Sequence, residues 1–127
     1  MSGRVVHFEI PFDDRERASA FYGQLFGWKV DHMAEFDYTS VVTGPMSEDG
    51  STTAEPGYIN GGLAKRSDIP GGGSVVTIDV EDIDATLARV EGLGGSTLVE
   101  RTDVGGMGFT AYFRDCEGNV VGLWQNA

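Results

Sequence analysis

The sequence predicts an α+β fold in which two βαβββ modules form a curved, barrel-like mixed sheet with a helix on each outer face. Residues 6–27 and 74–95 share one pattern, in which alternating apolar residues give way to an acidic residue, helical spacing and a terminal glycine. The two copies are related by a constant offset of 68 residues. Three strand-like segments follow each copy, so each half is predicted to form one βαβββ unit.

The first strand, about residues 4–12, alternates between two chemically different faces. Phe8 and Ile10 point to the core face, and His7 and Glu9 point to the opposite face. The polar face is therefore the one that we expect to meet a ligand.

A helix follows this strand, capped by Asp13 or Asp14 and ended by Gly27. Its apolar residues have the spacing of a single stripe, which we expect to face the core. The stripe comprises Ala18, Phe21, Tyr22, Leu25 and Phe26, and Trp28 continues it into the next strand. A second helix is predicted over residues 82–93, with Ile83, Leu87 and Val90 as its apolar residues.

Turn-forming residues separate the remaining strands. These strands are predicted at about 28–33, 36–43, 58–64, 74–80, 96–102, 108–114 and 119–125. The chain is predicted to be one domain, 1–127, with module one at about 4–64, a linker at 65–73 and module two at about 74–125.

Composition limits the classes of partner. A net charge of −11 argues against nucleic acid and anionic membranes, because both require clustered basic residues. No apolar run approaches the roughly 20 residues that span a bilayer, and the first residues lack the pattern of a signal peptide. Cys116 is the only cysteine, so a cytoplasmic location is the simplest expectation.

Three segments carry a resemblance to a known family. They read HFEIPFDDRERASAFYGQLFGW at 7–28, VEDIDATLARVEGLGG at 80–95 and FRDCEGNVVGLW at 113–124. Together they resemble the vicinal oxygen chelate superfamily, which includes glyoxalase I, extradiol dioxygenases, and fosfomycin- and bleomycin-resistance proteins. The resemblance spans nearly the whole chain and implies the paired βαβββ fold.

The resemblance also implies four metal-ligand positions, one on each of four strands. His7 matches the first position, whereas Val75, Gly62 and Gly122 occupy the other three. A divalent ion held tightly by protein usually needs three or more ligands. We therefore expect neither a protein-held metal nor another cofactor, and we expect His7 to serve as a hydrogen-bonding group. A substitute site using His7, Glu9 and Asp79 is a weaker alternative.

Strand alternation identifies the side chains that should line the predicted cleft. They are His7, Glu9, Asn60, Thr77, Asp79 and Trp124. Trp124 has two readings, because its indole suits stacking on a flat or cationic ligand and equally suits core or dimer packing.

We therefore expect a small-molecule-binding protein, most similar to the bleomycin-resistance type, that sequesters a cationic or aromatic ligand. The resemblance and the open sheet edges lead us to expect a homodimer. The alternative is a lyase, isomerase or dioxygenase that uses a rebuilt metal site or metal-free acid/base chemistry at His7 or Glu9. A subunit or sensor domain without chemistry of its own is a third possibility.

Overall fold

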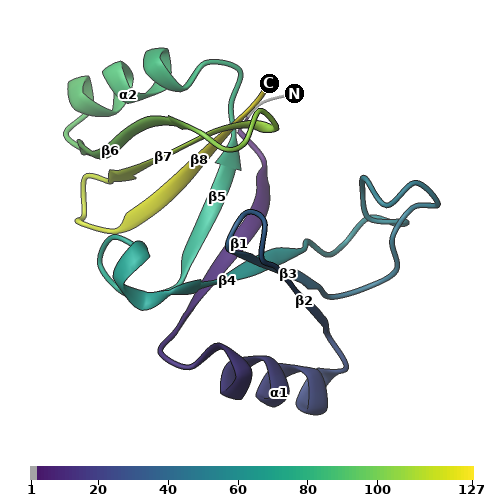
Figure 1. Ribbon diagram of the computed structural model, residues 1–127. Coiled ribbons are helices and arrows are strands. Elements are labelled where there is room, and N and C mark those ends of the chain that lie inside the picture. The colour runs from purple at the N-terminus through teal and green to yellow at the C-terminus, as the bar shows by residue number, and fades with distance from the viewer. Residues whose placement is uncertain (1–2) are drawn as a thin grey trace. The chain divides into compact units, whose positions relative to one another are not determined.

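The computed structural model describes residues 3–127 and divides them into two compact units. The first module comprises His7–Ser74, and the second comprises residues 3–6 together with 75–127. Each module is described by itself below (Figure 1).

The elements follow the predicted order, with a short 3-10 turn added after the first module's last strand. They are β1 (Val5–Phe12), α1 (Arg15–Phe26), β2 (Lys29–Met33), β3 (Tyr38–Val42), β4 (Gly61–Lys65), η1 (Arg66–Asp68), β5 (Val75–Asp79), α2 (Ile83–Gly92), β6 (Ser96–Asp103), β7 (Gly108–Arg114) and β8 (Val120–Asn126). The α+β class and the doubled βαβββ order predicted from the sequence are confirmed.

Within each module the sheet is mixed. The strand order is β2-β3-β4-β1 in the first module and β5-β8-β7-β6 in the second. The pairs β1–β4 and β5–β8 are parallel, and the other pairs within the modules are antiparallel. The two sheets therefore share one topology, which is the structural counterpart of the sequence repeat.

Both helices begin at the predicted acidic caps. The Asp14 carboxylate accepts a hydrogen bond from the Arg17 N–H at 3.1 Å, and Asp82 accepts one from the Ala85 N–H at 3.1 Å. Each bond satisfies a backbone donor that the first helical turn leaves without an intrahelical partner. Gly27 ends α1 in the left-handed conformation, with φ of 73°.

The second module has a compact core between α2 and its sheet (Figure 1). Ile83 and Leu87 of α2 pack against Ala111 of β7 and Leu123 of β8. The predicted helix face is therefore the buried one in this module.

The predicted core stripe of α1 is wrong for three of its residues. Tyr22 is half-buried and stacks on Trp28, with ring centroids 5.1 Å apart. Phe21, Leu25 and Phe26, in contrast, are each more than half exposed. The half-buried residues of α1 are Arg15, Ala18, Ser19, Tyr22 and Gly23, so small side chains are found where the prediction had large apolar ones.

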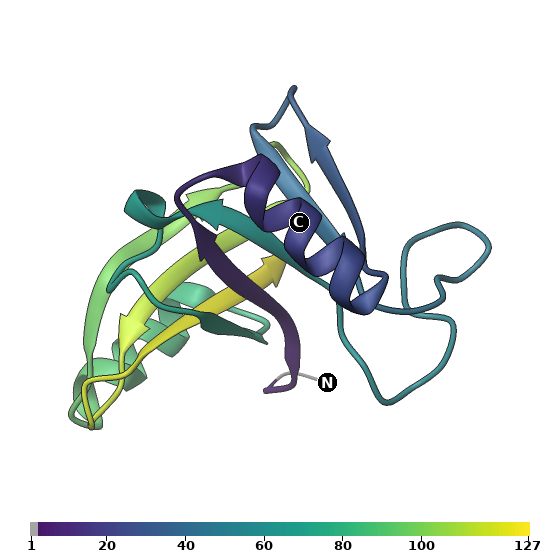
Figure 2. The ribbon, with the colours of Figure 1, turned by 90° about the horizontal axis from the view of Figure 1, so that it is seen from below.

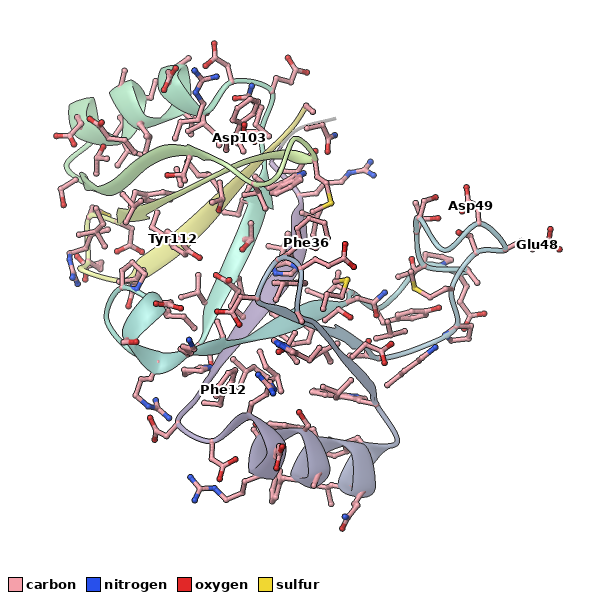
Figure 3. All side chains as sticks on the ribbon, viewed as in Figure 1. Phe12, Phe36, Glu48, Asp49, Asp103 and Tyr112 are labelled. Carbon is pink, nitrogen blue, oxygen red and sulfur yellow. The ribbon has the colours of Figure 1, made fainter. Side chains whose placement is uncertain are left out.

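The long connection between β3 and β4 is organised by hydrogen bonds. Asp49 accepts bonds from the hydroxyls of Ser47 and Ser51, both at 2.7 Å, and from the Ser51 N–H at 3.0 Å. These donors lower the pKa of Asp49 to about 2. Figure 3 shows Glu48 and Asp49 at the tip of this loop.

Neither helix among residues 3–127 combines the length and apolar character that crossing a membrane requires.

Candidate functional site

The polar face of the first module is built around Gly62 on β4. Gly62 is paired with Glu9 of β1 on one side and with Ser40 of β3 on the other. A Cβ atom at Gly62 would lie only 2.6 Å from the Tyr38 phenol oxygen, so the Tyr38 side chain covers this glycine. A Cβ atom built on the neighbouring Gly61 would point to the opposite face, where it would meet the Phe8 ring.

Tyr38 brings an aromatic hydroxyl to the predicted ligand-binding residues. Its ring centroid lies 6.5 Å from that of His7, with the two planes inclined by 26°. Its hydroxyl donates a hydrogen bond of 3.4 Å to the Gly61 carbonyl. His7 and Glu9 of β1 and Tyr38 of β3 thus form one cluster across β4, where Gly62 provides the space between them.

Electrostatics keep this cluster in defined protonation states. Burial, and then the charge of Glu9, raise the pKa of Tyr38 to about 12, so its phenol remains a hydrogen-bond donor at neutral pH. Burial lowers the pKa of His7, which favours the neutral imidazole. The cluster therefore presents a phenol O–H, a neutral imidazole and a carboxylate.

The shift at Tyr38 gives a testable prediction. Glu9→Gln should lower the Tyr38 pKa below its wild-type value while leaving it above 10, because burial is the larger cause and remains. Ultraviolet titration of the tyrosinate band, compared with a Tyr38→Phe variant that identifies the Tyr38 transition, measures this. An unchanged transition in Glu9→Gln would show that Glu9 does not act on the phenol.

The same shift predicts how stability depends on pH. The unfolded chain ionises Tyr38 near the ordinary tyrosine pKa of about 10, and the folded chain ionises it near 12. The unfolded state therefore loses this proton first, and the contribution of Tyr38 to stability decreases as pH rises between these values.

The second module repeats the arrangement with different side chains. Gly122 of β8 is paired with Thr77 of β5 and with Tyr112 of β7. A Cβ atom at Gly122 would lie 2.9 Å from the Thr77 hydroxyl oxygen. The offset of 68 residues matches Glu9 to Thr77, so the carboxylate of the first module is replaced by a hydroxyl in the second. Tyr112, the other partner of Gly122, is labelled in Figure 3.

Trp124 lies two residues beyond Gly122 on β8, and Asp79 lies two residues beyond Thr77 on β5. The two residues are partners in the register of this strand pair. The indole N–H of Trp124 donates to the Asn126 side chain at 2.8 Å. One edge of the ring covers Gly108, where a Cβ atom would be 2.7 Å from Trp124 Cη2. The packing role of Trp124 is thus visible within the module, and its role in stacking on a ligand stays a prediction.

Asn60 holds the loop that precedes β4. Its side-chain oxygen accepts a hydrogen bond of 2.8 Å from the Thr43 N–H, and its amide nitrogen lies 2.9 Å from Met46 Sδ. These contacts fix the start of β4 against the end of β3. Ligand contact by Asn60 stays a prediction.

His32 lies apart from the cluster. It is exposed, and its Nδ1 is 3.0 Å from the Thr39 hydroxyl on the face opposite Tyr38. It belongs to β2, whose residues are mostly exposed.

The residues at the family's metal positions do not fit a tightly held divalent ion. The phenol of Tyr38 occupies the space in front of Gly62, and the hydroxyl of Thr77 occupies that in front of Gly122. Val75 is 3% exposed and has no donor atom. Among residues 3–127, no three His, Cys, Asp or Glu side chains form a group that could hold a metal.

A shallow groove of about 510 Å³ lies elsewhere, between α2 and β6. Arg101 in this groove pairs with Asp84 at 3.5 Å, and Glu91 accepts a hydrogen bond from the Thr97 N–H at 2.7 Å. None of the six predicted ligand-binding residues lines it.

The fold and the sequence can now be compared with known proteins. Residues 4–44 match the family described as Bleomycin resistance protein-like N-terminal. A glyoxylase-like domain-containing protein of Didymella fabae is 35% identical over 124 residues, which cover 94% of this chain and 91% of that protein. The chain belongs to the vicinal oxygen chelate superfamily.

Further comparisons give lower identities. Two mycobacterial proteins named CFP32, from Mycobacterium bovis and Mycobacterium tuberculosis, are each 27% identical over 119 residues, and the chain spans 41% of their length. A methylmalonyl-CoA epimerase solved with methylmalonyl-CoA and NH4+ shares the fold with a TM-score of 0.65 and 19% identity, covering 100% of this chain and 96% of that one.

Tyr38 is the residue that sequence reasoning missed. Its signal was the alternation within the predicted strand 36–43, which places Tyr38 and Ser40 on one face and the buried Thr39 and Val41 on the other. The pattern alone did not show that the phenol would cover Gly62.

Proposed function

We propose that the protein binds and sequesters a small cationic or aromatic organic molecule without a protein-held metal, acting in the cytoplasm as a homodimer. The observation that supports this best is the cluster of His7, Glu9 and Tyr38 at the position where the superfamily's metal ligands are replaced. The proposed ligand-binding residues are His7, Glu9, Tyr38, Asn60, Thr77, Asp79 and Trp124.

The chemistry of the cluster favours a ligand with a positive charge or hydrogen-bond donors. Glu9 supplies a negative charge strong enough to raise the pKa of Tyr38. A half-buried carboxylate gains most from a cationic group, because that group offsets the cost of its desolvation. The net charge of −11 adds a long-range field of the same sign.

Metal-free proton transfer is the second candidate, and the state of His7 favours it. An imidazole whose pKa is lowered by burial is available as a base, whereas the Tyr38 phenol would have to give up its hydrogen bond to the Gly61 carbonyl before it could donate to a ligand. A lyase or isomerase reaction would use His7 as the base that accepts the substrate proton. Saturable turnover that is abolished by His7→Ala would favour this candidate over sequestration.

A ligand screen tests the proposal. Benzyltrimethylammonium should raise the melting temperature more than neutral benzyl alcohol, and benzoate should have the least effect. Glu9→Gln should weaken binding of the cation while leaving benzyl alcohol unchanged. Trp124→Ala should weaken aromatic ligands roughly two- to thirtyfold, since stacking or cation–π contact contributes about 0.5–2 kcal/mol.

Exposed Glu117 offers a matched control for the charge, because Glu117→Gln removes one carboxylate from a turn of the second module and leaves Glu9 in place. Glu117→Gln should leave the order of the three ligands intact. Stabilisation by benzoate equal to that by the cation would show that the charge of the site is misassigned.

A further inference from the structure

The groove between α2 and β6 lies outside the proposed ligand site. Its volume is about 510 Å³, and it belongs wholly to the second module. One wall is a face of α2, and the other is β6, the edge strand of that module's sheet. Figure 2 shows α2 behind the strands of this sheet, so the helix covers one of its faces.

We propose that this groove binds an exposed basic segment of a partner protein. The aliphatic stem of one lysine or arginine of the partner would lie on Leu87 and Ala88, and its charged head would meet the carboxylates of Glu91 and Glu100. The proposal goes beyond the proposed function, because it concerns another module and another kind of partner. It stands or falls independently of ligand binding in the first module.

A β-bulge is the first argument. Between two register pairs with β7, the strand β6 has two residues, Glu100 and Arg101, where β7 has only Ala111. Neighbouring side chains of a regular strand point to opposite faces, whereas Glu100 and Arg101 both line the groove. Bulges re-aim side chains at sheet edges and next to functional sites. This bulge therefore accounts for two charged residues in a row on the side of α2.

The face of α2 is the second argument, because it places apolar residues between two carboxylates. Asp84, Leu87, Ala88 and Glu91 have the spacing of one helix face, and all four line the groove. Leu87 is 7% exposed, and Ala88 is exposed. The stem of a lysine or arginine can cover such apolar surface while its charged head stays in water. Pockets for drug-sized molecules are more enclosed and more apolar, so a side chain of a partner fits this groove better.

The balance of charge is the third argument, and it determines the kind of partner. Arg101 is the basic residue of the groove, and it is already held by Asp84 at 3.5 Å and lies 4.8 Å from the centroid of the Phe109 ring. Glu91 accepts a backbone hydrogen bond at 2.7 Å, which orients its carboxylate and leaves the charge in place. Among residues 3–127, neither Glu91 nor Glu100 forms an ion pair. The groove therefore has negative charge that a basic partner complements.

The experiment is an NMR titration of the isotope-labelled full chain with the peptide Lys-Ala-Lys-Ala-Lys, blocked at both ends. The largest shifts should occur at the backbone signals of Leu87, Glu91 and Glu100, and the peptide Gln-Ala-Gln-Ala-Gln should cause none. Glu100→Gln should weaken binding roughly two- to fivefold, the effect of losing one exposed ion pair. Glu91→Gln is the second variant, because its amide oxygen can still accept the Thr97 N–H.

Glu117→Gln is the matched control, since it removes a carboxylate that does not line the groove. It should bind the lysine peptide like the wild type, and so should Glu9→Gln, which alters the ligand site alone. Shifts spread evenly over the acidic surface, or an equal loss of affinity in Glu117→Gln and Glu100→Gln, would overturn the proposal. Equal shifts at the groove with spermidine would replace the protein partner with a small amine, and shifts confined to His7 and Glu9 would place the peptide in the ligand site.

Discussion

Replacing Gly61 with alanine is expected to lower the free energy of unfolding by about 1–3 kcal/mol or more. A Cβ atom at this position would overlap the backbone carbonyl oxygen of Phe8 and lie 2.6 Å from Phe8 Cδ1. Phe8 is the register partner of Gly61 in the parallel β1–β4 pair, so its backbone cannot move away without disturbing the ladder. Urea denaturation followed by circular dichroism measures the loss.

Gly73→Ala is the matched control. No atom lies within 4 Å of a Cβ built at Gly73, and its backbone is not left-handed. This substitution should change the free energy of unfolding by less than about 0.5 kcal/mol. Similar losses for the two variants would mean that general glycine effects, and not the approach of Phe8, determine the cost at Gly61.

The parts of the fold that depend on local chemistry were predictable from the sequence. Asp14 and Asp82 precede helical spacing, and both cap helices as expected because a carboxylate satisfies the free N–H groups of the first turn. The repeat also predicted equivalent register, since Ile10 opposite Leu63 in the first module corresponds to Ile78 opposite Leu123 in the second.

What surrounds a helix was not predictable in the same way. The apolar spacing of α1 shows which residues are hydrophobic and not what covers them, so Phe21 and Leu25 were assigned to a core that they do not join. In α2 the same reasoning succeeded, because Ile83 and Leu87 are met by Leu123. The two helices have similar apolar spacing, but different elements pack against them, and the spacing alone does not show which ones.

The candidate site was predictable strand by strand, and its packing was not. Alternation correctly assigned His7 and Glu9 to one face of β1. The position of Tyr38 over Gly62 depends on side-chain direction across three strands that are distant in the sequence. The sequence shows that a tyrosine and a glycine are present, but it does not show the strand register that brings Tyr38 over Gly62.

Restoring a carboxylate at Gly62 is expected to be costly unless Tyr38 is removed first. In Gly62→Glu the new Cβ would lie 2.6 Å from the Tyr38 phenol oxygen and 2.9 Å from its Cε1 and Cζ atoms. The new carboxylate would also stand opposite Glu9, where like charges destabilise a strand pair. We expect a loss of about 2–4 kcal/mol from overpacking and unfavourable burial of charge.

A double-mutant cycle separates these causes. In a Tyr38→Ala background the space in front of Gly62 is open, so Gly62→Glu should cost less than in the wild type, by roughly 1–2 kcal/mol. Gly62→Gln, which has a similar shape without the charge, should show the same coupling to Tyr38 and a smaller total loss. Equal losses with and without Tyr38 would refute the idea that the phenol closes this position. Coupling of the expected size would mean that the phenol and a family-type carboxylate exclude each other, so a chain that regains the carboxylate must also give up Tyr38.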